Sequence, residues 1–415
     1  MSDPATNPEI TVYGSHWCPD CHRSKQFLGE QQIPYRWVDI EEDTEGEAFV
    51  IEANQGKRRI PTLTFGDGTV LSNPSNAELA QQLGFKTSAS KSHYDLIIVG
   101  GGPSGLTAAL YTAREGIDTL VIERAAFGGQ AAATVHLDNV PGFPEGVTGS
   151  ELSGRFRQQA ERFGVELLEA QDVVGIHSHH NYHCVVLADG TEYSALAVLL
   201  ATGSKYRRLG VEGEDDYLGS GVHYCATCDG PFYREQPVAV IGGGNSAAEE
   251  SLFLSDMASH VTMLVRGDAL RASQVIVSTV EERPNIDVRF HTQVKEFEGA
   301  DSKLQSLRVE SPDGEETLEL PAAFVFIGLD PSTAYLKDTP VRLDGQGFVV
   351  TGHCLVHDGD RPAGYETRDP GPLETSVPGI FAAGDLRAGS TKQVASAAGE
   401  GAAVAIGIRE FLRRH

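Results

Sequence analysis

Two copies of one local pattern, an apolar strand followed by a glycine-rich turn and a helix, limit what this chain can fold into. Residues 94–99 form an almost continuous apolar run, as buried strands of parallel sheets do, and lead into Gly-Gly-Gly-Pro-Ser-Gly at 100–105. The pattern returns at 238–241, which lead into Gly-Gly-Gly-Asn-Ser-Ala at 242–247. Glycines in such turns let the backbone approach a pyrophosphate at the N-terminus of the following helix. The sequence therefore predicts an α/β protein with two dinucleotide-binding domains. The candidate phosphate-binding residues are Gly100, Gly102, Pro103, Ser104 and Gly105 in the first turn and Gly242, Gly244, Asn245 and Ser246 in the second.

The strand that follows each helix indicates which dinucleotide each domain binds. In the first domain this strand, 119–122, ends at Glu123, whose carboxylate can accept hydrogen bonds from ribose hydroxyls. In the second domain the strand 260–265 is followed by Arg266 and then by Arg271. Cations at this position favour the 2′-phosphate of NADPH over NADH. Two such domains imply two dinucleotides, most simply a flavin and a nicotinamide.

Four of the six cysteines stand in two C-x-x-C pairs, Cys18/Cys21 and Cys225/Cys228. Such a pair can exchange two electrons as a dithiol and a disulfide, and Asp229 can carry the proton that thiol chemistry gains or loses. Half of a zinc site is the alternative reading of a single pair. Zinc would need a second ligand pair at suitable spacing, whereas these pairs are about two hundred residues apart. The pattern indicates redox-active cysteines and not a structural disulfide framework.

Charge and hydropathy exclude several kinds of partner. The net charge of −25 argues against nucleic acid and anionic membranes, because both would repel the chain, and a solvated acidic surface is its simplest meaning. Residues 1–9 carry no basic and apolar signal, and no apolar run approaches the roughly 18 residues that span a bilayer. We therefore expect a cytoplasmic protein.

Residues 10–85 are expected to form a small domain with the element order β-α-β-β-α. The strands are expected at 10–13, 35–40, 62–65 and 70–71, and the helices from Cys18 to Leu28, before Gly29, and from Pro74 to Gln82. The C-P-D-C motif after the first strand and the proline before the third strand resemble glutaredoxins, particularly their mycoredoxin-like branch. The resemblance implies a thioredoxin-like fold in which Pro61 is cis and faces the cysteines.

The position of Cys18 at the start of a helix favours its thiolate, so Cys18 is the expected attacking thiol and Cys21 its resolving partner. Asp20 stands where glutaredoxins more often carry tyrosine, and its charge is expected to raise the pKa of both cysteines. The alternative for this domain is a thioredoxin-type module with inert cysteines.

Residues 86–93, with the sequence Lys-Thr-Ser-Ala-Ser-Lys-Ser-His, are small and polar and are expected to be a linker. Eight such residues span about 15 Å on average and at most about 28 Å. As a tether, this linker would hold the small domain at roughly millimolar effective concentration near the rest of the chain.

Residues 94–415 resemble the low-molecular-weight thioredoxin reductases. The resemblance rests on the two dinucleotide patterns, on C-A-T-C-D-G directly before the second pattern, and on F-A-A-G-D at 381–385. It implies a discontinuous FAD-binding domain at 94–210 and 325–415 and an NADPH-binding domain at 211–324 that carries Cys225 and Cys228.

The same resemblance assigns roles to single residues. Cys228 would lie next to the flavin, Cys225 would attack the substrate, and Asp229 would be the acid. In this family the nicotinamide and the disulfide occupy the same side of the flavin in turn, so the inner domain must rotate. Asp385 would bond the ribityl chain, and residues 392–394 would approach the isoalloxazine. The further FAD-binding residues implied are Arg124, Gly128, Gly129, Gln130, Asn139, Gly203, Lys392, Gln393 and Val394.

Three segments depart from the family pattern or fall outside it. Gly267 replaces one arginine of the family's phosphate-binding motif, which weakens the preference for NADPH. Residues 352–372, which include His353, Cys354, His357 and Asp358, form a polar insertion that we expect to be a solvated surface loop and not a metal site. The histidines and the cysteine of 177–184 are likewise expected to lie in an exposed turn of a hairpin between Val173 and Leu187.

The sequence as a whole predicts an NADPH- and FAD-dependent disulfide reductase with its own glutaredoxin-like acceptor. Electrons would pass from NADPH through FAD to Cys225/Cys228, then to Cys18/Cys21 of the same chain or of the other subunit of a dimer, and finally to an external disulfide or thiol adduct. The alternatives are a flavin subunit that feeds a peroxiredoxin and a flavoprotein redox sensor with a weakened nicotinamide site. A homodimer is expected, as in relatives of this type.

Overall fold

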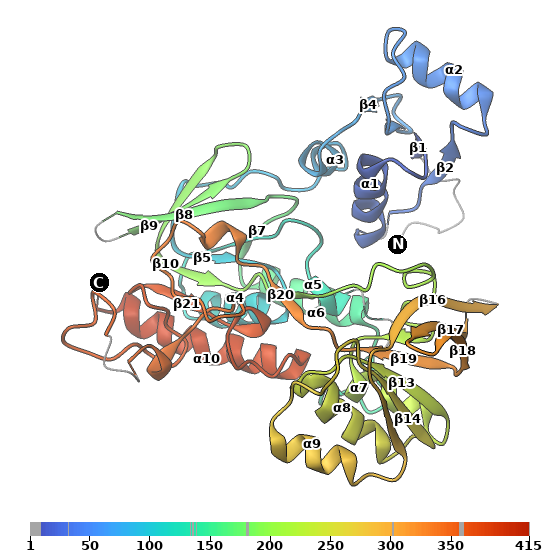
Figure 1. The fold of residues 1–415 in the computed structure, drawn as a ribbon. Helices are drawn as coiled ribbons and strands as arrows, with labels where there is room; N and C mark the ends of the chain where they lie inside the picture. Colours follow the sequence, from blue (N-terminus) through green and yellow to red (C-terminus); the bar gives the residue numbers. More distant parts are fainter. Residues whose placement is uncertain are drawn as a thin grey trace. The chain divides into compact units, whose positions relative to one another are not determined.

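The computed structural model describes residues 10–31, 33–132, 134, 137, 139–179, 182–300, 303–356 and 361–414. The chain forms two compact units (Figure 1). The first comprises Met1–Ala133, Thr148–Gly203 and Ser332–His415, and the second comprises Thr134–Val147 and Ser204–Pro331.

The N-terminal part of the first unit has a sheet with the strand order β2-β1-β3-β4. Strand β1 pairs in parallel with β2 and antiparallel with β3. Apolar side chains of β1, β3, α1 and α3, among them Val12, Phe27, Leu63 and Leu79, form its core. The elements in chain order are β1 (Thr11–Gly14), α1 (Pro19–Glu30), β2 (Arg36–Asp39), α2 (Thr44–Ala53), β3 (Thr62–Thr64), β4 (Val70–Ser72) and α3 (Asn76–Gln82).

The structure corrects two expectations for this part: the order of the elements and the end of the first helix. Helix α2 lies between β2 and β3, where no helix was predicted; it begins after Asp43, whose carboxylate accepts a hydrogen bond from the Gly46 amide at 2.8 Å. Helix α1 continues through Gly29 to Glu30 instead of ending before the glycine. The expected cis peptide bond between Ile60 and Pro61 is confirmed.

The larger part of the first unit is built on a mostly parallel sheet with the strand order β7-β6-β5-β10-β9-β8, with β21 also paired to β10. Helices α4, α6 and α10 pack one apolar cluster against the sheet, in which Leu96, Leu106, Ala160 and Val404 meet. Figure 1 shows α10 lying alongside α4. A second cluster, which includes Ile97 and Val185, contains the side chains of the opposite face. The elements are β5 (His93–Val99), α4 (Pro103–Arg114), β6 (Thr119–Ile122), α5 (Gly129–Ala132), α6 (Gly149–Arg162), β7 (Glu166–Leu168), β8 (Val173–His179), β9 (Tyr182–Leu187), β10 (Glu192–Leu200), η2 (Ala334–Leu336), η3 (Gly352–Leu355), β21 (Ile380–Ala382), η4 (Gly384–Leu386) and α10 (Val394–Leu412).

The expected linker, 86–93, does not run free: it is hydrogen-bonded to the sheet of the larger part. The Lys86 carbonyl accepts from the Glu169 amide (3.1 Å), the Ala89 amide donates to the Tyr193 hydroxyl (3.1 Å), and the Ser92 carbonyl accepts from the Ser194 amide (2.9 Å). A small polar sequence therefore becomes ordered through partners that are distant in the chain.

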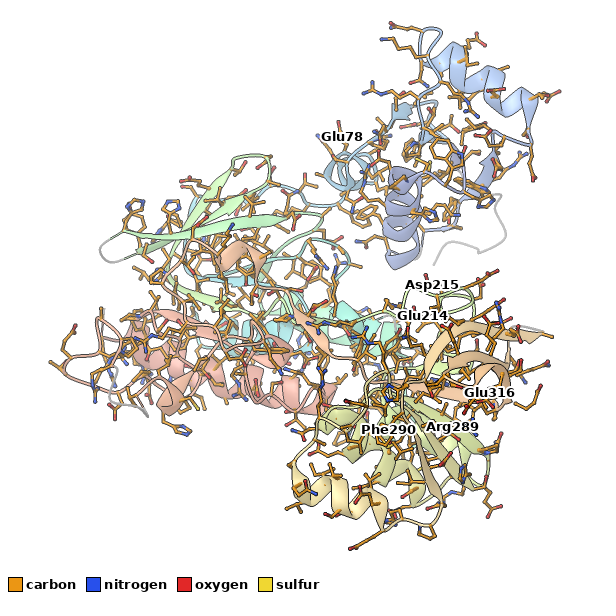
Figure 2. The ribbon with its side chains drawn as sticks, in the orientation of Figure 1. Glu78, Glu214, Asp215, Arg289, Phe290 and Glu316 are labelled. Carbon is orange, nitrogen blue, oxygen red and sulfur yellow. The ribbon has the colours of Figure 1, made fainter. Side chains whose placement is uncertain are left out.

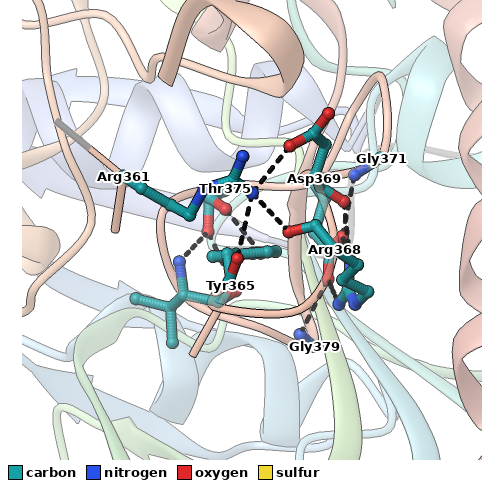
Figure 3. A network of polar contacts seen from close by, with 9 residues as sticks. Arg361, Tyr365, Arg368, Asp369, Gly371, Thr375 and Gly379 are labelled. Carbon is teal, nitrogen blue, oxygen red and sulfur yellow. Dashed lines mark hydrogen bonds and ion pairs between the residues drawn. The ribbon is translucent and has the colours of Figure 1, made fainter. Parts of the chain in front are cut away.

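The insertion at 352–372 is anchored, which corrects the expectation of a solvated loop. The side chain of Tyr365 is fully buried, and its hydroxyl donates to a backbone carbonyl at 2.8 Å. Arg368 binds the buried carboxylate of Glu374 through two hydrogen bonds of 2.7 Å, and Arg361 donates to two carbonyls of the same loop (Figure 3). An aromatic ring and a paired guanidinium hold the loop, and the sequence pattern did not reveal that Tyr365 and the Glu374 carboxylate would be buried.

Of the possible metal ligands in this insertion, His357 and Asp358 lie outside the described residues. His353 Nε2 and Cys354 Sγ are 3.9 Å apart, and Cys354 is exposed.

The second unit is organised around a parallel sheet with the strand order β12-β19-β13-β14-β15. Strand β13 pairs in parallel with both β14 and β19, and helix α8 packs on these strands through Ala247, Ala248 and Leu254. The elements are β11 (Ser204–Tyr206), β12 (Val222–His223), α7 (Ala226–Asp229), η1 (Gly230–Tyr233), β13 (Pro237–Ile241), α8 (Asn245–Ser255), β14 (His260–Leu264), α9 (Gln274–Glu281), β15 (Ile286–Arg289), β16 (Gln293–Ala300), β17 (Lys303–Ser311), β18 (Gly314–Glu319), β19 (Ala322–Val325) and β20 (Leu329–Pro331).

Candidate active site

The first glycine-rich turn connects β5 to α4 and has the shape that a phosphate requires. Gly100 has a φ of +107°, and a Cβ atom there would lie 2.4 Å from the Ala201 carbonyl oxygen. A Cβ atom on Gly105 would lie 2.0 Å from the carbonyl oxygen of Gly100. Gly102 is the N-cap residue of α4, and no described atom lies within 4 Å of its Cβ position. The first amides of α4 thus face space that no neighbouring side chain occupies near Gly102, which leaves room for an anion.

Glu123 ends β6 beside this turn, with 9% of its surface exposed. Its carboxylate accepts hydrogen bonds from the Gly101 amide (2.7 Å) and the Ala125 amide (3.0 Å), while burial raises its pKa. A cavity of about 80 Å³ is lined by Gly100, Glu123, Arg124 and Thr202 among others. A buried carboxylate that borders a cavity next to a phosphate-type turn fits the ribose of an adenine dinucleotide.

The predicted turn at 128–130 lies against the same loop. The Gly128 amide donates to the Gly101 carbonyl at 2.8 Å, and its φ of +113° permits a close approach to Ser153. Gly129 and Gln130 are exposed at the start of α5. Asn139, predicted to bind the same cofactor, is exposed in the segment Thr134–Val147, which belongs to the second unit. The structure therefore gathers the glycines of this set within the first unit, whereas Asn139 is part of the second.

The C-terminal candidates lie around the turn η4 and the start of α10. The Ser104 hydroxyl of the first turn donates to the Ala383 carbonyl at 3.3 Å, so the two segments meet. Asp385 follows, and burial raises the pKa of its carboxyl although the nearby Lys392 lowers it. Lys392 Nζ donates to the Asp385 carbonyl at 2.6 Å, and burial lowers the pKa of this amine.

Helix α10 begins at Val394, and Gln393 is its N-cap residue. Among the described residues, no side-chain hydrogen bond caps this end of the helix. Gly203 has a φ of +67° and its carbonyl accepts from the Ser332 amide at 3.0 Å. This set of an open helix N-terminus, buried carboxylates and positive-φ glycines fits a bound FAD.

The second glycine-rich turn connects β13 to α8 and repeats the first. Gly242 has a φ of +141°, and a Cβ atom there would lie 2.3 Å from the Phe326 carbonyl oxygen, whereas Gly244 has no described atom within 4 Å of its Cβ position. The Asn245 side chain accepts from the Ser273 amide at 2.8 Å, and Ser246 is exposed.

Both predicted arginines are exposed near this turn. The Arg271 amide donates to the Gly243 carbonyl at 2.6 Å, which joins the segment after β14 to the glycine turn. Arg266 directly follows the buried Val265 at the end of β14. The structure therefore brings Arg271 to the phosphate-type turn of the second unit, as the preference for NADPH requires.

The redox pair of the second unit follows β12, with Cys225 directly before α7 and Cys228 within α7. Cys225 is disulfide-bonded, and the side chain of Cys228 lies outside the described ones. Asp229 Oδ2 is 3.4 Å from Nδ1 of His223, and His223 Nε2 is 2.8 Å from the hydroxyl of Tyr233. His223 is buried, with 4% of its surface exposed. Sequence reasoning missed His223 and Tyr233, although both flank the C-x-x-C pair.

The backbone before Cys225 is also fixed by polar contacts. The Tyr224 hydroxyl donates to the carboxylate of Glu214 (2.5 Å), a residue that is labelled in Figure 2. The same carboxylate accepts from the amides of Leu209 and Gly210. Burial and Glu214 raise the pKa of the Tyr224 phenol, so it remains a donor.

The N-terminal redox pair lies at the start of α1. Cys18 is the N-cap residue, and its sulfur accepts from the Cys21 amide at 3.3 Å. Burial, together with the hydrogen bond to Cys18, raises the pKa of Cys21 to about 12. A thiol that stays protonated next to a helix-capping thiol suits the predicted division into resolving and attacking cysteines.

Asp20 acts on Cys21 in the expected direction, but its effect is small because its charge is paired. Its carboxylate forms an ion pair with Arg23 and accepts from the Asn73 amide group at 3.3 Å. The charge of Asp20 does raise the pKa of Cys21, but it is the smallest of the causes found. Pro61 is buried, and its carbonyl accepts a hydrogen bond from the Asn73 amide at 2.6 Å. Trp17, directly before Cys18, has 67% of its surface exposed.

Comparison with models of known protein families identifies the class of this protein. The family model of pyridine nucleotide-disulphide oxidoreductases matches residues 94–401, and the glutaredoxin model matches residues 10–70. The chain therefore belongs to the pyridine nucleotide-disulphide oxidoreductases, as a reductase of the thioredoxin reductase type with an N-terminal glutaredoxin domain.

Relatives and solved structures agree with this assignment. The thioredoxin reductase of Treponema pallidum is 40% identical over 75% of this chain and 95% of its own length. A bifunctional thioredoxin reductase/thioredoxin of Mycobacterium leprae is 40% identical over 79% of this chain and 68% of that protein. The crystal structure of thioredoxin reductase from Streptococcus pyogenes superimposes with a TM-score of 0.70 at 36% identity, over 79% of this chain and all of the other.

The predicted resemblances, fold class and enzyme class are thus confirmed. Thioredoxin reductases use FAD and NADPH, which fit the two turns described above. Within the described residues, no helix has the length and apolar character needed to cross a membrane.

Proposed function

We propose that this chain is an NADPH- and FAD-dependent disulfide reductase whose Cys225/Cys228 pair passes electrons to its own Cys18/Cys21 pair, which then reduces an external disulfide or thiol adduct. Bound FAD supplies the two-electron reduction of the Cys225–Cys228 disulfide, with NADPH as the electron source. The residues predicted for the two cofactors and for the two redox pairs form the proposed site.

The transfer between the pairs is a dithiol–disulfide exchange. The Cys225 thiolate attacks the sulfur of Cys18, the Cys18–Cys21 bond breaks, and the Cys21 sulfur takes up a proton, as its pKa of about 12 favours. The Cys228 thiolate then attacks Cys225, the Cys225–Cys228 disulfide re-forms, and Cys18 leaves as a thiolate at a helix N-terminus. Asp229 accepts and returns the proton of the Cys225/Cys228 pair.

The observation that supports this proposal is that one chain carries two dithiol sites with different surroundings. Cys18 caps a helix and holds the Cys21 amide, whereas Cys225 precedes an aspartate that faces His223. Typical potentials also permit the order, since transfer from about −270 mV to between about −230 and −200 mV is favourable by roughly 2–3 kcal/mol.

We further propose that the second unit rotates during turnover and that the protein is a cytoplasmic homodimer. In the first unit, the chain leaves at Gly203 and returns at Ser332, where the Ser332 amide donates to the Gly203 carbonyl. Two of the crossings between the units are thus joined at one point, which suits a hinge there.

The deciding experiment is NADPH-driven reduction of a panel of protein disulfides and thiol adducts by the intact chain and by Cys18→Ser. We expect the variant to lose turnover on substrates served by the glutaredoxin domain and to keep NADPH-dependent reduction of Cys225–Cys228. Cys354→Ser is the matched control, because it removes an exposed cysteine outside both pairs. Full activity of Cys18→Ser on every substrate would exclude the glutaredoxin domain from the pathway, and coupling to a peroxiredoxin in the same panel tests the alternative role as a peroxidase subunit.

A further inference from the structure

We propose that the β8–β9 hairpin of the first unit carries a site for a borderline-soft divalent cation of the Zn²⁺ class, with His177, His179 and Cys184 as protein ligands. One ligand atom of each residue, two imidazole nitrogens and a sulfur, lie within 4.8 Å of one another. The sequence predicts that these residues lie in an exposed turn of a hairpin; the hairpin is present, but they stand on its two strands, and Cys184 is buried. The strand register brings the three side chains together, and this arrangement revises our expectation that they bind no metal.

The register explains why these side chains meet. His177 of β8 is directly opposite Cys184 of β9, and His179 follows two residues later, so it points to the same face. The rings of His177 and His179 are 4.9 Å apart, edge to face. On the other face of the hairpin, Ile176 and Val185 are buried in the core. The ligands are therefore held by two paired strands that the core keeps in place.

The donor set matches a particular class of metal. Imidazole nitrogen and thiolate sulfur suit Zn²⁺ and related ions, whereas Mg²⁺ and Ca²⁺ prefer oxygen. Tetrahedral bonds of about 2.0–2.3 Å would place the ligand atoms roughly 3.3–3.6 Å apart. His179 is exposed and can rotate to close the difference, while Cys184 is 7% exposed and keeps its position on the strand. Three protein ligands leave a fourth position for water.

The charges around the thiol are consistent with a cation. Glu192 lies two residues from Ser194, the partner of Cys184 on β10, so its carboxylate is on the same face of the sheet and would attract a divalent cation. Ser194, opposite Cys184 on β10, places a hydroxyl on the next strand.

The site can be tested apart from the reductase activity. The full-length, untagged chain is oxidised so that both C-x-x-C pairs are closed, which leaves Cys184 and Cys354 as thiols. Zn²⁺ binding is then measured by competition with a chromogenic chelator, and Co²⁺ is used as a probe of thiolate ligation by its sulfur-to-metal charge-transfer absorption. The variants are Cys184→Ser and His179→Gln, and the control is Cys354→Ser, whose thiol lies 3.9 Å from the imidazole of His353.

We expect one equivalent of Zn²⁺ to bind to the wild type and to Cys354→Ser. Binding should weaken by about 100-fold or more in Cys184→Ser and His179→Gln, because loss of a ligand costs at least as much as loss of a supporting residue. The Co²⁺ absorption should disappear in Cys184→Ser. Because His179 is exposed, His179→Gln tests the site even if the substitution of buried Cys184 disturbs folding. Unchanged Zn²⁺ affinity in both variants, or no Zn²⁺ binding by the wild type, would refute the site.

Discussion

Among single residues, His223 is placed to control the acid beside the second redox pair. Its ring is buried between Phe324 and Tyr233, with ring centres 5.3 Å from each, and its two nitrogens face Asp229 and the Tyr233 hydroxyl. A buried imidazole with both nitrogens in contact has little freedom to turn. We infer that His223 positions Asp229 for the proton transfer that accompanies exchange at Cys225.

Replacing His223 with Phe tests this role, because the new ring can still pack against Phe324 and Tyr233 but cannot form the polar contacts with Asp229 and the Tyr233 hydroxyl. We expect thiol–disulfide exchange to slow by about tenfold, the lower part of the range for general acid–base catalysis, while reduction of the bound flavin by NADPH keeps its rate. Single-turnover kinetics separate the two half-reactions. Tyr233→Phe, which removes one of the two contacts, should have a smaller effect. Equal slowing of both half-reactions would instead indicate a general structural role.

Arg271, whose side chain is exposed, is the residue on which the preference for NADPH depends most directly. Its amide is bonded to Gly243, so the segment is fixed beside the second glycine turn. A hydrogen bond to a charged group contributes about 1.5–3 kcal/mol, so Arg271→Ala should raise the KM for NADPH by roughly tenfold to a hundredfold and leave that for NADH unchanged. Steady-state kinetics with both nucleotides measure this ratio. Arg283→Ala, at an arginine paired with Asp256, is the control, and a parallel loss with both nucleotides would argue against phosphate recognition.

At the scale of elements, the start of β7 holds the segment that joins the glutaredoxin part to the rest. The Glu166 carboxylate accepts from Lys86 Nζ (2.6 Å), from the amide and hydroxyl of Ser90 (2.6 and 2.7 Å), and from the Tyr94 hydroxyl (2.6 Å). Although burial opposes it, these hydrogen bonds lower the pKa of Glu166 from 4.5 to about 2. A single carboxylate thus binds both ends of residues 86–93, although the composition of this segment suggests a flexible linker.

Substitution of Glu166 by Gln should release this segment. The loss of a charged acceptor costs about 1–3 kcal/mol, so tryptic cleavage after Lys86 and Lys91 should become faster at neutral pH, as limited proteolysis would show. Because the folded-state pKa is lowered, the stabilisation is present above pH 4.5 and is lost as the pH falls toward 2. The difference in urea stability between the wild type and the variant should therefore shrink over that interval. Glu161→Gln, at an exposed carboxylate paired with Arg157 in α6, is the control, and equal protection of both variants would contradict the prediction.

The elements that the sequence predicts well are those set by local rules. The apolar strands at 94–99 and 238–241 and the glycine turns after them follow from periodicity and from steric limits on φ, and they are found as expected. Helix α2 was missed because Gly46 interrupts a weak helical pattern, and only the Asp43 cap reveals its start. The binding of 86–93 and the burial of Tyr365 depend on partners far along the chain, which no local pattern encodes. His223 was missed for the same reason, since its role depends on contacts and not on a motif.

At the scale of the whole molecule, the chain combines a part of the thioredoxin reductase type with an N-terminal glutaredoxin domain. The Mycobacterium leprae relative is named a bifunctional thioredoxin reductase/thioredoxin, which shows that such a fusion is not confined to this chain. A covalent connection replaces a diffusional encounter with an effective concentration in the millimolar range, provided that the geometry allows contact. The hydrogen bonds that join 86–93 to the sheet of the same chain limit how far Cys18 can move from that chain.

We therefore expect transfer from Cys225 to Cys18 within one chain. The test combines Cys18→Ser, which keeps the second redox pair, with Cys225→Ser, which keeps the first. A co-expressed, doubly tagged pair of these variants should show almost no NADPH-driven reduction of glutaredoxin-domain substrates, since neither chain holds a complete path. Transfer between subunits would instead restore about half of the wild-type activity, because one of the two crossed paths in a dimer is intact. The wild-type rate per chain should also stay constant as the enzyme is diluted from micromolar to nanomolar concentration, and a fall on dilution would show that the path requires a second molecule.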